Sequence, residues 1–147
     1  MRPRRGRCAL CLVTTVLLPT VAFFRRRDLA EVICGALHAR FVEGKTRSEV
    51  VAGTGAHPDT VRGWFRRFVA RAEEIRVLFS SWAHRFDASL GGIEARGSPA
   101  ADAMEAIGVA AAAAGRWLGP APLWSFVAGV SGGLLLSNTS CPQRAES

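Results

Sequence analysis

The densest set of chemically active side chains in this chain is a group of arginines near its centre. Four of them fall within ten residues: Arg62, Arg66, Arg67 and Arg71. No acidic residue lies between Thr60 and Ala70 to neutralise them. A guanidinium group offers five N–H donors in a planar fork, which suits phosphate oxygens and the acceptor edges of bases. The group predicts a surface that binds a polyanion, although a solvated helix face would have the same pattern.

The residues before these arginines carry signals for the start and the end of a short helix. Thr46 and Glu49 have the spacing of a capping box, in which each side chain satisfies an orphan backbone N–H. This helix should end near residues 53–55, where glycine tolerates a left-handed turn. His57 then stands at an N-cap position and Pro58 at N1, where a missing N–H costs nothing. A second helix is therefore expected after a tight turn.

This second helix has one apolar and one polar side. The apolar side consists of Val61, Trp64, Phe65 and Phe68. The polar side consists of Asp59, Thr60, Arg62, Gly63, Arg66 and Arg67, and Arg71 follows it. Together the two helices predict a helix-turn-helix whose second helix enters the major groove of double-stranded DNA. We expect the seven polar positions to contact DNA and Trp64 to belong to the core.

The expected DNA contacts differ along the helix. Arg62 and Arg66 should face base edges or phosphates, whereas Arg67 and Arg71 should hold the sugar-phosphate backbone. Gly63 should let the helix backbone approach a groove closely, at a cost of about 1 kcal/mol relative to alanine.

The stretch V-V-A-G-T-G-A-H-P-D-T-V-R-G-W-F-R-R resembles the helix-turn-helix of transposase-like and resolvase-like bacterial proteins. Gly55, Thr60, Val61 and Trp64 match that pattern, while Val51 and Thr54 replace its usual Ala and Leu. Upstream, C-A-L-C-L-V-T-T-V-L-L-P is similar to the second half of a zinc ribbon. The combination resembles small actinobacterial proteins associated with insertion sequences, over residues 7–86. The resemblance implies a cytoplasmic, nucleoid-associated DNA-binding protein that is an accessory or a remnant of a transposase-like system.

Two cysteines, Cys8 and Cys11, have the spacing of half a zinc site. They are the metal ligands to expect if zinc is bound, and we expect no other cofactor. Cys34 and His38 lie one helical turn apart and would complete a Cys₃His site. We favour instead that Cys34 fills the core and His38 is solvated. The four cysteines are too few and too irregularly spaced for a disulfide framework, which favours a reducing compartment.

The net charge of +7 is unevenly distributed. Residues 1–27 carry seven arginines and no acid, whereas residues 87–147 are slightly acidic. This asymmetry suits a protein whose N-terminal part faces a polyanion. The alternative explanation is a GC-rich genome, because the basic residues are almost all arginine.

We expect no enzyme. A metal-dependent nuclease needs clustered carboxylates, and the second half offers only Asp87, Glu94, Asp102, Glu105 and Glu146, without strands to hold them. His57 and His84 lack a convincing nucleophile partner, and no small-molecule substrate is evident.

The predicted fold is mainly α: a helix-turn-helix three-helix unit with an extended third helix, a short N-terminal β segment and C-terminal helices. We assign residues 1–27 to a basic tail and a partial zinc-ribbon-like β segment, with strands on either side of Pro19. Residues 28–86 form the helix-turn-helix domain, which should begin with a capping box at Asp28 and Glu31. A linker (87–98), a C-terminal helical region (99–137) and a disordered tail (138–147) complete the chain.

Two helices should have complementary seams. The third helix should run on to Phe86, because large apolar residues recur at alternating spacings of four and three. They are Val61, Phe65, Phe68, Ala72, Ile75, Phe79, Trp82 and Phe86. A second seam is rich in alanine: Ala100, Met104, Ile107, Ala111, Ala114 and Leu118. We predict that the two helices pack as an antiparallel hairpin, and homodimerisation through the remaining apolar surface stays open.

One alternative belongs to a different class. A small membrane-associated helical protein would embed the apolar segments 8–24 and 123–136. The first is interrupted by Pro19 and the second is too short to span a bilayer, so we favour DNA binding and a short buried helix at 123–136. A decayed reading frame that folds only in part is a third reading.

Overall fold

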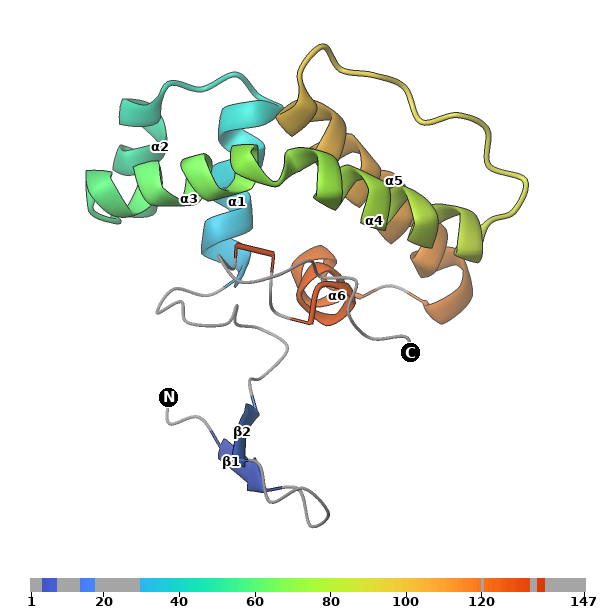
Figure 1. Cartoon of the computed structure of the whole chain (residues 1–147). Coiled ribbons are helices and arrows are strands. Elements are labelled where there is room, and N and C mark those ends of the chain that lie inside the picture. Colours follow the sequence, from blue (N-terminus) through green and yellow to red (C-terminus); the bar gives the residue numbers. More distant parts are fainter. Residues whose placement is uncertain (1–3, 8–13, 18–29, 120, 133–134, 137–147) are drawn as a thin grey trace.

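The computed structural model describes residues 4–7, 14–17, 30–119, 121–132 and 135–136, and within them it is mainly helical. Strand β1 (Arg4–Arg7) pairs antiparallel with β2 (Thr14–Leu17), with Arg4 opposite Leu17. The helices are α1 (Ala30–Phe41), α2 (Arg47–Thr54), α3 (Pro58–Ala70), α4 (Ala72–Phe86), α5 (Pro99–Leu118) and α6 (Leu123–Val130) (Figure 1).

Several predictions lie outside the described residues. These are the cysteine pair Cys8 and Cys11, the helix start at Asp28, the strand expected after Pro19 and the tail from residue 138. Arg4–Arg7 belong to a strand, whereas the sequence suggested a basic tail there.

The local signals around α2 and α3 are confirmed. The Thr46 side chain accepts from the Glu49 N–H, and the Glu49 carboxylate accepts from the Thr46 N–H at 2.7 Å. Gly55 ends α2 with a φ of 67°, a left-handed conformation that favours glycine. His57 caps α3 by accepting from the Asp59 N–H, and Pro58 follows at the first helical position. Three residues therefore separate two well-capped helices.

Aromatic side chains join α3 to α1. Val61, Trp64 and Phe68 are fully buried, as their spacing predicts. The Phe41 ring at the end of α1 stacks on Phe68 and meets the edge of Phe65, with 5.6 Å between centroids in both pairs. Trp64 is the largest fully buried side chain among the described residues. The side of α3 that faces the core is thereby set, and its opposite side faces solvent.

The prediction of one continuous third helix is wrong. Arg71 (φ −119°, ψ 11°) separates α3 from α4, and its N–H donates to the Phe68 carbonyl rather than four residues back. No glycine or proline lies between Phe68 and Ile75, so helix propensity does not cause the break. Tertiary packing accounts for it, because α3 packs against α1 and α2 while α4 packs mainly against α5.

The predicted pairing of the two seams is confirmed, but its antiparallel direction is wrong. Helix α5 packs along α4, and the two run parallel (Figure 1). The Arg116 guanidinium near the end of α5 pairs at 2.7 Å with Asp87, the C-cap of α4. Arg76 and Asp102, near the starts of the two helices, line one cleft. The linker 87–98 therefore runs back along the whole hairpin.

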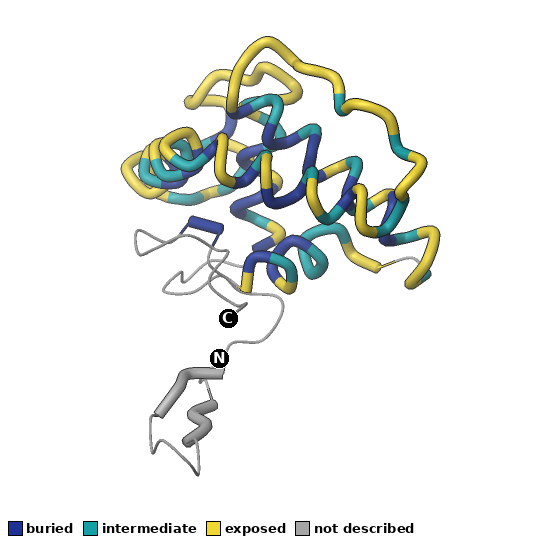
Figure 2. Tube along the Cα trace, turned by 45° about the vertical axis from the view of Figure 1, so that its right-hand side comes forward, coloured by how far each residue is buried: buried dark blue, intermediate teal, exposed yellow. Residues whose placement is uncertain are grey.

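The linker is long enough for this path. Helix α4 spans about 22 Å at ~1.5 Å per residue, whereas an extended segment of the linker's length reaches about 40 Å. Figure 2 shows that the linker is exposed over most of its length.

Alanines form most of the α5 surface that faces α4 and the rest of the core. Ala103, Ala106, Ala110 and Ala113 are completely buried. Small side chains let helix axes approach, which leaves room for Ile75 and Phe79 of α4. Leu118, predicted in this seam, is instead 72% exposed. The seam therefore ends before the last turn of α5.

Helix α6 closes the lower side of the helical body. Its Phe126 ring lies 6.3 Å from both Phe79 and Phe86, and Val127 and Ala128 are buried. Segment 123–136 thus contains the short, partly buried helix that the sequence suggested. No helix of the described residues is long and apolar enough to cross a membrane.

Candidate nucleic-acid interface

An open groove of about 750 Å³ lies where the end of α1, the start of α2 and one side of α3 meet. Arginines and apolar side chains make up most of its lining. The lining residues are Arg40, Phe41, Arg47, Ser48, Arg62, Phe65, Arg66, Val69 and Ala70. We call this surface the arginine groove.

Three helices each contribute to its positive charge. Arg40 lies in the last turn of α1, where a cation interacts favourably with the helix dipole. Arg47 is the first residue of α2, next to the Thr46 cap. Arg62 and Arg66 are four residues apart on α3 and so share one side of that helix. Arg40 and Arg47 are close to the α3 arginines only because the three helices pack together.

The acidic residues nearest these cations are largely engaged elsewhere. Glu43 pairs with Lys45 at 2.7 Å and with His38 at 3.0 Å. Hydrogen bonds from Lys45 and then His38 lower the pKa of the Glu43 carboxyl. Hydrogen bonds from the Thr46 hydroxyl and backbone N–H likewise lower the pKa of Glu49. These carboxylates neutralise Lys45 and cap α2, which leaves the arginine groove positive.

The four groove arginines differ in how they are held. The Arg62 Nη2 lies 3.0 Å from the Asp59 carboxylate, and both side chains are about two-thirds exposed. The Arg40 Nη1 donates to the Lys45 carbonyl at 3.0 Å. Within the described part of the chain, Arg47 and Arg66 make no ion pair. Two guanidinium groups are thus oriented by the protein, and two lack a carboxylate partner.

Two of the predicted contact residues are turned away from the exposed arginines. Arg71 pairs with Glu74 at 3.1 Å, and its side chain is only 12% exposed. The Arg67 side chain lies over Gly63, where its Nη1 would be 2.8 Å from an added Cβ. Its Nε is buried without a hydrogen-bond partner among the described residues. Gly63 therefore makes room for Arg67, in addition to the close approach expected of it.

The remaining predicted positions, Asp59 and Thr60, are exposed on the first turn of α3. Arg40 and Arg47 were not predicted, because they are separated from α3 in the sequence. One signal was available: each lies at a helix end that the capping pattern places next to the turn.

The apolar part of the arginine groove consists of Phe41, Phe65 and Val69. Val69 is 52% exposed, which is unusual for a large apolar side chain beside three helices. Such surface can contact the sugar of a nucleic acid or the methyl group of thymine.

No metal site is evident among the described residues. Cys34 is buried, and burial raises the pKa of its thiol well above the usual range. His38 is partly exposed and pairs with Glu43. No group of three His, Cys, Asp or Glu side chains in the described ranges could hold an ion. Cys34 is thus a buried core residue and His38 a solvated one, as we favoured.

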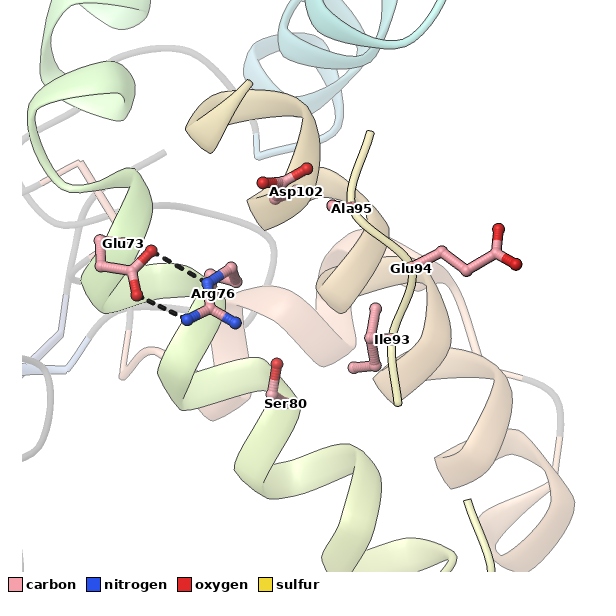
Figure 3. A pocket seen from close by; sticks show the side chains of 7 residues that line it. All are labelled: Glu73, Arg76, Ser80, Ile93, Glu94, Ala95 and Asp102. Atoms are coloured by element: carbon pink, nitrogen blue, oxygen red, sulfur yellow. Dashed lines mark hydrogen bonds and ion pairs between the residues drawn. The ribbon is translucent and has the colours of Figure 1, made fainter. Parts of the chain in front are cut away.

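A second cleft, of about 350 Å³, lies between α4, α5 and the linker (Figure 3). The Arg76 guanidinium forms two hydrogen bonds with the Glu73 carboxylate, at 2.9 and 2.6 Å. Glu94 points away from them, and the Ser80 hydroxyl is buried without a partner in the part of the chain described. The principal charged groups of this cleft satisfy each other, unlike those of the arginine groove.

No family model, curated protein or solved structure matches this chain significantly. The case for a function therefore rests on the geometry of the arginine groove.

Proposed function

We propose that this chain binds double-stranded DNA without a catalytic centre of its own, through a helix-turn-helix formed by α1, α2 and α3. The observation that carries the proposal is the arginine groove, in which four guanidinium groups from three helices lie beside the exposed side of α3. The compact turn between α2 and α3, with Gly55 in the left-handed conformation, supports it.

The arrangement suits a duplex in two ways. An α-helix fits the major groove, whose width is about 12 Å, and α3 presents Asp59, Arg62 and Arg66 on its outward side. Arg40 and Arg47 lie beside this helix rather than on it. They are suited to the phosphates that border the groove, since phosphate contacts set register and orientation.

The biological role we propose is that of an accessory or remnant of a transposase-like insertion-sequence system. It rests on the resemblance between residues 50–67 and the helix-turn-helix of those proteins. The seven arginines in residues 1–27 would add further electrostatic attraction to DNA.

The test is a fluorescence-anisotropy titration of a random-sequence duplex at several salt concentrations. Each phosphate contact releases counterions, so four contacts should give a slope of log K against log salt of about −3 to −4. A variant with Arg85→Gln and Arg116→Gln is the control, because both side chains lie at the far ends of α4 and α5. It should bind like the wild type. Absent or salt-independent binding by the wild type would contradict the proposal.

A further inference from the structure

Asp59 is the one carboxylate on the outward side of α3, and a surface for phosphates alone does not explain it. It lies in the first turn of α3, three residues before Arg62. A carboxylate directed at a phosphate would be repelled. Its place beside the arginine groove is better explained if this part of α3 faces the bases rather than the backbone.

The ion pair orients the guanidinium of Arg62. The Arg62 Nη2 lies 3.0 Å from Asp59 Oδ1, while both side chains remain about two-thirds exposed. Arginine has five donors, so holding one of them fixes the plane and leaves others free to donate outward. The second carboxylate oxygen, Oδ2, lies 3.8 Å from His57 Nδ1 and can still accept a hydrogen bond. The pair therefore presents a fixed donor fork next to an acceptor.

A G·C base pair offers the complementary pattern. In the major groove, guanine presents its N7 and O6 acceptors, and cytosine presents its N4 amino donor beside them. An A·T pair presents an acceptor, a donor and an acceptor, followed by the thymine methyl group. The fork of Arg62 would meet the adenine amino group there, and Asp59 would face an acceptor.

We propose, on the basis of the DNA-binding function above, that Asp59 and Arg62 form a base-reading pair that selects guanine at one position of the target. Arg62 donates to guanine N7 and O6. Asp59 holds the guanidinium in plane and accepts from the amino group of a cytosine in the same or the adjacent pair. Arg66, Arg40 and Arg47 then supply charge without base selectivity.

The test is selection from a random-sequence duplex library, followed by titration of the selected site. The wild type should enrich one guanine, and replacing that base should weaken binding by about tenfold or more. Replacing its N7 with carbon, as 7-deazaguanine does, should cause a comparable loss. Arg62→Lys keeps the charge but lacks the fork, so it should retain the salt slope and lose this preference.

Asp59→Asn separates reading from folding. It removes a negative charge from the interface, so its affinity for unselected duplex should stay level or rise while the guanine preference falls. Glu31→Gln is the matched control, because it removes an exposed first-turn carboxylate at the start of α1, away from the arginine groove. It should leave both quantities unchanged, as should melting of all three variants.

The outcomes separate the two proposals. If the wild type binds DNA with steep salt dependence but Asp59→Asn keeps its guanine preference, the base-reading pair is wrong and the DNA-binding function stands. If the wild type binds no duplex, both are wrong.

Discussion

Alanine at Trp64 should lower the free energy of unfolding by about 3–5 kcal/mol. Trp64 is 1% exposed and is the largest fully buried side chain described. It belongs to α3, which contacts α1, α2 and α5, so a cavity there would loosen all of these contacts. Urea denaturation followed by circular dichroism measures the change.

The chain provides a matched control for this substitution in Trp117, which is 75% exposed. Trp117→Ala should change stability by no more than about 0.5 kcal/mol, as surface substitutions usually do. Equal effects at the two positions would mean that Trp64 is not a core residue. A Trp64→Ala variant that melts like the wild type and fails to bind DNA would instead place this side chain in the interface.

Removal of residues 99–147 should leave a protein that self-associates or precipitates. The deletion takes away α5 and α6, which pack against α1, and α5 also covers α4. Ile75, Leu78 and Phe79 would be exposed as one apolar stripe, and soluble monomers rarely present such a surface. Sedimentation velocity measures the association. A soluble, monomeric fragment would show that α4 does not need its partner helix.

A single substitution tests the same packing without removing any element. Ala106 is completely buried, whereas Ala112 is exposed on the same helix. Ala106→Leu should destabilise by about 1–3 kcal/mol through overpacking, and Ala112→Leu should be nearly neutral. Equal melting of these two variants would contradict the close approach of α4 and α5.

Local features of this chain could be predicted from its sequence because they depend on neighbouring residues. The caps at Thr46 and His57 and the left-handed Gly55 each involve groups within four residues. The burial of Trp64 and Phe68 follows from the helical period in the same way. A single stretch of sequence contains all the information that such features require.

Features that depend on distant parts of the chain could not be predicted. A seam of apolar residues shows which side of a helix meets its partner, but the pattern is the same for parallel and antiparallel partners. The break at Arg71 has no local breaker and reflects the different partners of α3 and α4. Arg40 and Arg47 join the α3 arginines only after three helices have packed, so one half of the arginine groove was not anticipated.

The most direct test of the central claim is the salt dependence of duplex binding by a variant with all four groove arginines replaced by glutamine. They are Arg40, Arg47, Arg62 and Arg66. All four line an open groove rather than the core, so the variant should melt close to the wild type. The account predicts that the slope of log K against log salt becomes shallower by about three to four, at roughly 0.9 per lost phosphate contact. A folded variant that keeps the wild-type slope and affinity would show that DNA does not bind in the arginine groove.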